Sequence, residues 1–243
     1  MNFLLPATGD EVLKSAIYRL GTHVCICAVG RGHVLLDLRR NRYYQVSLET
    51  PRLTQLARRE PIELLPTEQS QPSIQPLIQA GLIERCKSSD TIDLITTTID
   101  EPCTASDIPQ TYSRLPRARD VALFVRSLAW TRWVLRRRSF HEISHILRAH
   151  RQRQVAREFD TDSVLGLVAR FRQIRPWAFA SRDQCLLHAL TLVRFSMLHG
   201  LQASWVVGVM TQPWTAHSWA QYGNVVLDGN PEQVRPYRPI LVV

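Results

Sequence analysis

The sequence predicts an α+β fold, and the grouping of its short patterns carries that prediction. Three β-prone runs come first and are followed by short helical segments. In the C-terminal half, amphipathic helices come first and three further β-prone runs follow. Strands and helices grouped in this way, instead of alternating, are typical of α+β domains. The 243 residues are 45% apolar, which is enough for one large domain or two small ones.

Residues 1–87 predict the first domain, a winged-helix-like module built on a three-stranded sheet. Short β-prone runs stand at 24–29, 33–38 and 43–46, and Gly30-Arg31-Gly32 separates the first two at hairpin spacing. Small helices are expected after these strands, and a short strand is expected to close the module. Their ranges are 51–59 and 74–80 for the helices and 82–85 for the strand.

Residues 88–116 predict a linker. They are rich in Ser, Thr, Asp and Pro and show no sustained hydrophobic period. One short strand at 92–97 is the only element expected there.

Residues 117–243 predict the second domain, in which helices pack on an antiparallel sheet. Asp120 is expected to cap the first helix, whose apolar residues recur as far as Leu135. Ser181 is expected to cap the last helix, which ends at Gly200. The remaining helices are expected at 140–150 and 163–174, and the strands at 203–210, 217–222 and 225–227.

The apolar runs and the cysteines indicate a cytoplasmic protein. The sequence contains no run of eighteen apolar residues, which is the length that a membrane span needs, and the first residues lack the basic and apolar regions of a signal peptide. The five cysteines are odd in number and scattered, which fits a reducing compartment. Cys25 and Cys27 are interpreted as buried apolar residues, and no Cys/His set has zinc spacing. We therefore expect neither a metal nor a cofactor.

Positive charge is concentrated in one segment of the chain. The net charge is +9. Between Arg114 and Arg157 the sequence contains twelve arginines and only two acidic residues, Asp120 and Glu142. Such a segment can contact an anionic surface, a nucleic acid or an acidic peptide. A solvated helix face is the simpler interpretation, because arginine replaces lysine almost throughout this chain.

Three residues in the last sixty predict nucleophilic catalysis. Cys185 falls near the start of a predicted helix, where the helix dipole favours the nucleophilic thiolate. His217 begins a predicted strand, from which an imidazole can face that thiol as a base. Asp228 ends the next strand, where a carboxylate can orient the imidazole and stabilise its protonated form.

These residues lie in motifs that resemble the transglutaminase-like cysteine peptidase of lasso-peptide maturation B proteins. The motifs in the second domain are Cys185-Leu186-Leu187-His188-Ala189-Leu190, Leu198-His199-Gly200-Leu201, Val206-Val207-Gly208-Val209, His217-Ser218-Trp219 and Val225-Val226-Leu227-Asp228. In the first domain, residues 34–38 and 43–46 resemble a PqqD-like element, which binds the leader of a ribosomally made precursor peptide. The resemblance covers about 15–85 and 117–243.

The resemblance implies a leader peptidase with a papain/transglutaminase-like catalytic domain. Cys185 matches the nucleophile, His217 the base and Asp228 the third member of the triad. The leader would add a strand to the first domain's sheet, and a separate asparagine-synthetase-like ligase would close the macrolactam. The residues nominated for leader binding are Val34, Leu36, Tyr43 and Tyr44. Two departures from the family pattern are Ser218, where alanine is usual, and Gln221, where an acidic residue is frequent.

Several residues have a second interpretation. Cys185 on its own fits an inert buried thiol, and Asp228 fits a turn residue before Gly229. His188 lies three residues after Cys185 on the same helical face, and it competes with His217 as the base. Its geometry on the same helix is poorer, so site lining or packing is the preferred interpretation. The backbone N–H of Cys185 is the nominated oxyanion donor.

Two other functions compete with peptide hydrolysis. The same triad can pass the acyl group to an amine, as transglutaminases do, because the acceptor pocket sets the outcome. A basic winged-helix nucleic-acid binder is the third possibility. It is disfavoured because residues 74–79, the expected recognition helix, contain neither lysine nor arginine. We therefore expect no nucleic-acid partner.

Overall fold

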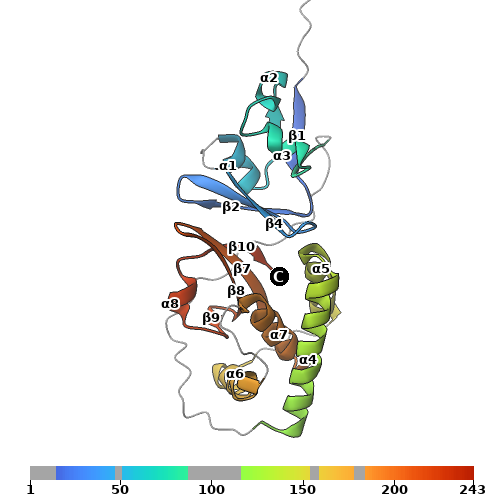
Figure 1. The fold of residues 1–243 in the computed structure, drawn as a ribbon, viewed down its shortest axis with the longest axis vertical. Helices are drawn as coiled ribbons and strands as arrows, with labels where there is room; N and C mark the ends of the chain where they lie inside the picture. Colours follow the sequence, from blue (N-terminus) through green and yellow to red (C-terminus); the bar gives the residue numbers. More distant parts are fainter. Residues whose placement is uncertain (1–14, 47–50, 87–115, 154–158, 178–183) are drawn as a thin grey trace, which may run out of the picture. The chain divides into compact units, whose positions relative to one another are not determined.

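The computed structural model describes residues 15–46, 51–86, 116–153, 159–177 and 184–243 (Figure 1). Its contacts divide the chain into two compact units. The first comprises Met1–Gly21 and Thr50–Ile92, and the second comprises Thr22–Glu49 and Asp93–Val243. The strands expected at 24–46 therefore group with the C-terminal region, apart from the small helices that follow them in sequence.

In the described residues, the first unit consists of a small three-stranded antiparallel sheet and three short helices. Its strands lie in the order β5, β1, β6, so the N-terminal strand is central. The helices predicted at 51–59 and 74–80 and the strand predicted at 82–85 are confirmed. The elements are β1 (Ala16–Leu20), α1 (Pro51–Ala57), β5 (Ile62–Leu64), α2 (Pro66–Gln69), α3 (Gln75–Gln79) and β6 (Ile83–Arg85).

The predicted three-stranded meander is confirmed within the second unit. It consists of β2 (Val24–Val29), β3 (Gly32–Asp37) and β4 (Arg42–Val46), paired antiparallel in that order. The β3–β4 turn is fixed by Asp37, whose fully buried carboxylate accepts the backbone N–H groups of Arg39 and Arg40 at 2.9 and 3.1 Å. Asp37 is thus a turn anchor.

A four-stranded antiparallel sheet forms the C-terminal part of the second unit. Its order is β10, β7, β8, β9, with β7 (Ser204–Thr211) and β8 (Trp214–Tyr222) as the long central hairpin. The three predicted strands are confirmed. The fourth, β10 (Arg238–Val242), and the short helix α8 (Pro231–Val234) were not predicted.

The two faces of this sheet carry different clusters of buried side chains. Trp205, Val207 and Ala220 belong to the main core, together with the buried residues of α7. Val206 and Trp219 belong to a smaller cluster that includes residues of α8 and β10. Because side chains alternate along a strand, neighbouring residues of β7 and β8 are divided between the two clusters.

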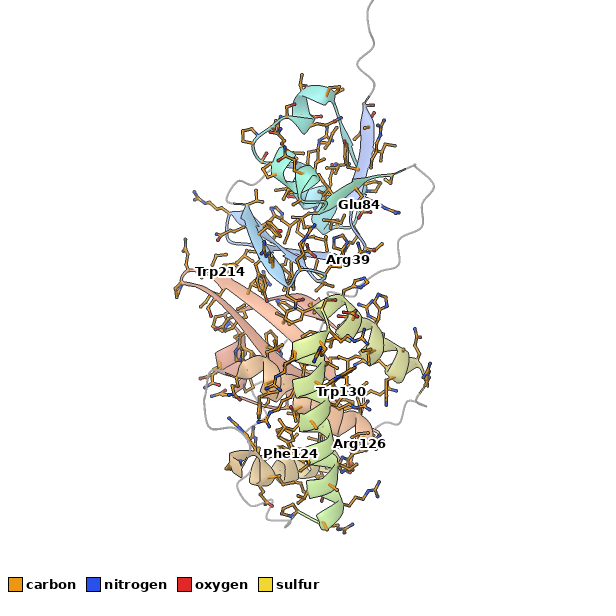
Figure 2. The ribbon with its side chains drawn as sticks, turned by 45° about the vertical axis from the view of Figure 1, so that its right-hand side comes forward. Arg39, Glu84, Phe124, Arg126, Trp130 and Trp214 are labelled. Atoms are coloured by element: carbon orange, nitrogen blue, oxygen red, sulfur yellow. The ribbon has the colours of Figure 1, made fainter. Side chains whose placement is uncertain are left out.

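Helices α4 (Ala118–Arg137), α5 (Phe140–Arg153), α6 (Thr161–Ile174) and α7 (Cys185–Leu198) complete the unit (Figure 1). Most side chains of α7 are buried, and it packs along α4 and against β8. Figure 2 labels Phe124 on α4, whose ring meets that of Phe171 on α6 with centroids 5.3 Å apart. None of the helices in the described ranges is long and apolar enough to cross a membrane.

The prediction for the start of the first of these helices is wrong in one detail. Asp120 is the third residue of α4, and Arg117 occupies the cap position. The Asp120 carboxylate accepts the backbone N–H of Arg117 at 3.0 Å, so it still satisfies a helix-end donor. The cap expected at Ser181 and the strand expected at 92–97 lie outside the described residues.

Candidate active site

Cys185 is the first residue of α7. Gln184 precedes it with non-helical backbone angles, φ −103° and ψ 38°. The thiol is half-buried and forms no disulfide. The first turn of a helix has backbone N–H groups that lack partners within the helix, and it carries the positive end of the helix dipole. A thiolate formed at Cys185, and an oxyanion formed beside it, would both lie at this end.

His217 lies on β8, directly across from Gly208 of β7. Its ring stacks on that of Trp219, with centroids 6.2 Å apart, and contacts the ring of Tyr237 at 5.3 Å. Burial lowers the pKa of His217 below its usual value, although the negative charge of Asp228 opposes this effect. The imidazole is therefore neutral at pH 7, as a general base requires.

Asp228 follows β9 (Val225–Val226) and is held by two other elements. Its Oδ1 accepts the backbone N–H of Ala220 on β8 at 2.9 Å, and its Oδ2 lies 3.3 Å from Nδ1 of His188 on α7. The Asp228 side chain is only 5% exposed. The guanidinium of Arg172 on α6 is close enough for the carboxylate to influence its pKa. Asp228 thus links three elements around the start of α7.

The structure brings Asp228 to α7 but does not hydrogen-bond the three predicted residues to one another. Among the described residues, His217 has no hydrogen bond to Cys185 or to Asp228. The strand alternation places His217 on the same sheet face as Trp219, whereas Ala220 belongs to the face that shares a core with α7. The catalytic roles of Cys185, His217 and Asp228 therefore stay predictions.

An aromatic groove lies along β4 near the same helix end. The ring of Tyr43 meets that of Trp214 edge-on, with centroids 5.7 Å apart. Residues 41–45 and Trp214 line an open groove with a volume of about 650 Å³. Figure 2 shows Trp214 at the tip of the β7–β8 hairpin. Burial raises the pKa of Tyr43 to about 12, and the charge of Cys185 adds to this effect, so the two side chains are within electrostatic reach.

Only two of the four residues nominated for leader binding have accessible side chains. Tyr43 and Tyr44 are half-buried, and Tyr43 also packs on the main core. Val34 and Leu36 are 0% exposed and lie in that core. Their side chains are therefore not accessible to a leader, and their nomination for leader binding stays a prediction that concerns the backbone of β3. The role of the two tyrosines stays a prediction.

Metal ligands are not gathered in the described part of the chain, where no three side chains of His, Cys, Asp or Glu form a candidate metal site. Cys25 is fully buried, and Cys27 is partly buried against the same core. Burial raises the pKa of Cys27 to about 12, with Cys25 contributing. This pair has the character of the buried apolar residues that the sequence predicted.

The contacts that two residues make with Asp228 were not predicted from the sequence. His188 was interpreted as lining or packing, and its bond to Asp228 was not anticipated. The spacing of three residues from Cys185 was the available signal, because it places both side chains on one face of a helix. No feature of the sequence linked Arg172 to the site, because Arg172 lies on a helix that comes near Asp228 only in the tertiary fold.

The sequence of the second unit matches a known protein family. Residues 113–242 match the family model described as the transglutaminase-like superfamily. No curated protein and no solved structure matched the chain. The matched segment includes Cys185, His217 and Asp228 and covers more than half of the 243 residues. The chain therefore belongs to the transglutaminase-like superfamily.

Proposed function

We propose that this protein is a cysteine peptidase that cleaves a peptide bond through a thioester on Cys185. The observation that carries the proposal is the position of this thiol at the start of a buried helix, one turn before an imidazole that contacts Asp228. Cysteine peptidases and acyltransferases of this superfamily use a thiolate as nucleophile, which accords with the match over 113–242.

In the proposed reaction His217 removes the proton from Sγ of Cys185. The sulfur attacks the carbonyl carbon of the substrate, and the negative charge on the carbonyl oxygen is stabilised by backbone N–H groups at the start of α7. The C–N bond then breaks as the protonated His217 gives its proton to the departing amine. Water, deprotonated by His217, hydrolyses the thioester, which releases the carboxylate and restores the thiol.

This mechanism requires the His217 ring to come within hydrogen-bond distance of Sγ of Cys185, although the alternation along β8 places His217 on the sheet face that does not share a core with α7. Its lowered pKa supports the role of base, because the imidazole is unprotonated at pH 7. Asp228 stabilises the imidazolium that forms, because its negative charge raises the pKa of His217. The sequence motif and this electrostatic link are the grounds for naming His217.

The proposed substrate is a ribosomally made precursor peptide whose leader is removed during lasso-peptide biosynthesis. The motif resemblance is the reason for naming this class. In the described residues β4 is an edge strand of its sheet, and an edge strand can pair with an extended peptide. A leader paired with β4 passes Tyr43, which lies within electrostatic reach of Cys185. The reaction is proposed to be cytoplasmic, with a macrolactam ligase as partner.

The test is cleavage of a candidate precursor peptide, followed by mass spectrometry. Cys185→Ala is expected to abolish cleavage while peptide binding, measured by fluorescence anisotropy, is retained. Cys86→Ala is the matched control, because Cys86 lies in the other compact unit, and it is expected to cleave at the wild-type rate. Cleavage by Cys185→Ala would overturn the proposal.

The same experiment separates hydrolysis from acyl transfer. With a primary amine added, hydrolysis leaves a free carboxyl group at the new C-terminus. Incorporation of the amine as an amide would instead assign the protein to transglutaminase-type transfer by the same thiol.

A further inference from the structure

The imidazole of His188 is fixed beside the predicted acid. The residue is 8% exposed, and its ring meets that of Phe171 in a T-shaped contact with centroids 5.3 Å apart. Its Nδ1 faces Oδ2 of Asp228 at 3.3 Å. An aspartate carboxylate is an acceptor, so this nitrogen is the donor when the bond forms. His188 is thereby held in one orientation by its packing and by its carboxylate partner.

His188 also shares a helix face with the predicted nucleophile. Residues three apart on a helix are neighbours on its surface, and helical side chains lean toward the N-terminus. The His188 side chain therefore extends over the turn that begins with Cys185. Any movement of Asp228 relative to this turn has to stretch or break the His188 bond.

The other oxygen of Asp228 is tied to the strand that carries His217. Its Oδ1 accepts the backbone N–H of Ala220 at 2.9 Å, three residues after His217 on β8. The charged and titratable groups near the carboxylate come from three elements: His188 on α7, Arg172 on α6 and His217 on β8. Asp228 is thus a bridge between the helix of the nucleophile and the strand of the base.

We propose that His188 is a positioning residue that holds Asp228 where its charge stabilises the imidazolium of His217. The proposal rests on the function proposed above for Cys185. His188 exchanges no proton with the substrate in this role. It donates from Nδ1 to Asp228, and the fixed carboxylate favours the state in which the proton has moved from Cys185 to His217. Loss of the His188 bond removes the described contact between this carboxylate and α7.

The test is the pH dependence of Cys185 alkylation by iodoacetamide, which needs no identified substrate. Peptide mapping by mass spectrometry gives the rate at Cys185 from pH 4 to pH 9. His188→Ala is expected to move the midpoint of the profile to higher pH, because the thiolate–imidazolium state loses its fixed counter-charge. We expect alkylation at pH 6.5 to slow by about five- to tenfold.

Two further variants test whether a slower rate in His188→Ala reflects a general loss of stability instead of the loss of the bond to Asp228. His188→Gln retains a side-chain N–H donor and is expected to stay within about threefold of the wild-type rate at pH 6.5. His199→Gln removes another imidazole–carboxylate contact from the same helix and is expected to leave the profile unchanged. Thermal melting of each variant shows how much stability is lost.

The outcomes separate this inference from the proposed function. A His188→Ala profile that coincides with the wild-type profile would overturn the inference and leave Cys185 as the nucleophile. A loss of reactivity as complete as that of His217→Ala would also overturn it, because His188 would then be a second base. A wild-type Cys185 that is no more reactive than Cys86 would instead defeat the proposed function.

Discussion

The two ends of helix α7 each carry an imidazole paired with a buried aspartate, but the surroundings of the two pairs differ. At the C-terminal end, Nε2 of His199 lies 3.0 Å from Oδ1 of Asp120. The other imidazole nitrogen, Nδ1, lies 3.0 Å from the carbonyl oxygen of Phe195. At the N-terminal end, His188 and Asp228 stand one turn after Cys185.

The difference lies in what each carboxylate is bound to. Burial raises the pKa of Asp120, but the Arg117 N–H, His199 and Arg170 outweigh it and hold this pKa below its usual value. Asp120 thus stabilises the folded chain by joining α4, α6 and α7. Asp228 instead joins α7 to the strand of His217, next to a thiol. We infer that the first pair stabilises the fold and that the second supports the chemistry.

The largest expected effect comes from replacing each aspartate in turn. Asp228→Asn is expected to lower kcat/KM for precursor cleavage by about 100-fold or more, because the imidazolium loses its counter-charge. Asp120→Asn is expected to keep kcat/KM within about twofold of the wild-type value and to lower the free energy of unfolding by about 1–3 kcal/mol. Steady-state cleavage and urea denaturation measure the two effects. Similar activity losses in both variants would remove the distinction between the pairs.

A second prediction disturbs only the face of the sheet that carries His217. A Cβ added at Gly208 would meet the Trp219 ring at 2.7 Å and Cβ of Tyr237 at 2.9 Å. Gly208→Ala is therefore expected to cost about 1–3 kcal/mol in unfolding free energy and to displace the rings next to His217. Urea denaturation and tryptophan fluorescence measure these changes. Gly166→Ala is the control, since a Cβ added there would meet the end of the Arg170 side chain at 4.0 Å, an ordinary contact distance. Unchanged stability of Gly208→Ala would contradict the packing described here.

The depressed pKa of Asp120 gives a third, smaller effect that depends on pH. A carboxylate whose folded pKa lies below its unfolded pKa stabilises the fold above the unfolded value, which is near 3.8 for aspartate. This contribution is lost as the pH falls through the folded value. The stability difference between wild type and Asp120→Asn is thus expected to be complete at pH 6 and to shrink below about pH 4. Denaturation at both pH values tests this, and a difference independent of pH would argue against the ionised pair.

The smallest effect is expected at Tyr43. Removal of its hydroxyl in Tyr43→Phe keeps the ring contact with Trp214 and is expected to change KM for the precursor by less than about threefold. Tyr43→Ala removes the ring from the groove and is expected to raise KM by about tenfold with kcat little changed. Equal KM values for Tyr43→Ala and wild type would exclude this groove as part of the peptide site.

Much of the fold follows from local patterns in the sequence. The meander at 24–46, the helices and the β7–β8 hairpin each have strong periodicity or turn residues, and all are confirmed. Strands β1, β5 and β10 were missed because they are short and pair with residues far away in the sequence. The burial of Val34 and Leu36 was missed for a related reason, since it depends on which part of the chain covers β3.

The candidate site was predictable as a set of residues but not as a network of contacts. Chain order and helix or strand position were enough to select Cys185, His217 and Asp228. The partner of Asp228 was not predictable, because a short loop after β9 decides whether its carboxylate turns toward β8 or α7. In the structure it contacts both, through Ala220 and His188.

The reactivity of Cys185 relative to the other thiols tests the central claim most directly. Limited alkylation of the folded wild-type protein at pH 7, followed by peptide mapping, gives the rate at each site. Cys27 is expected to be nearly inert, because burial raises its pKa to about 12. Cys185 is expected to react at least about tenfold faster than Cys86, as a thiol activated at a helix start with a histidine base does. Equal or slower alkylation of Cys185 would contradict its role as the nucleophile.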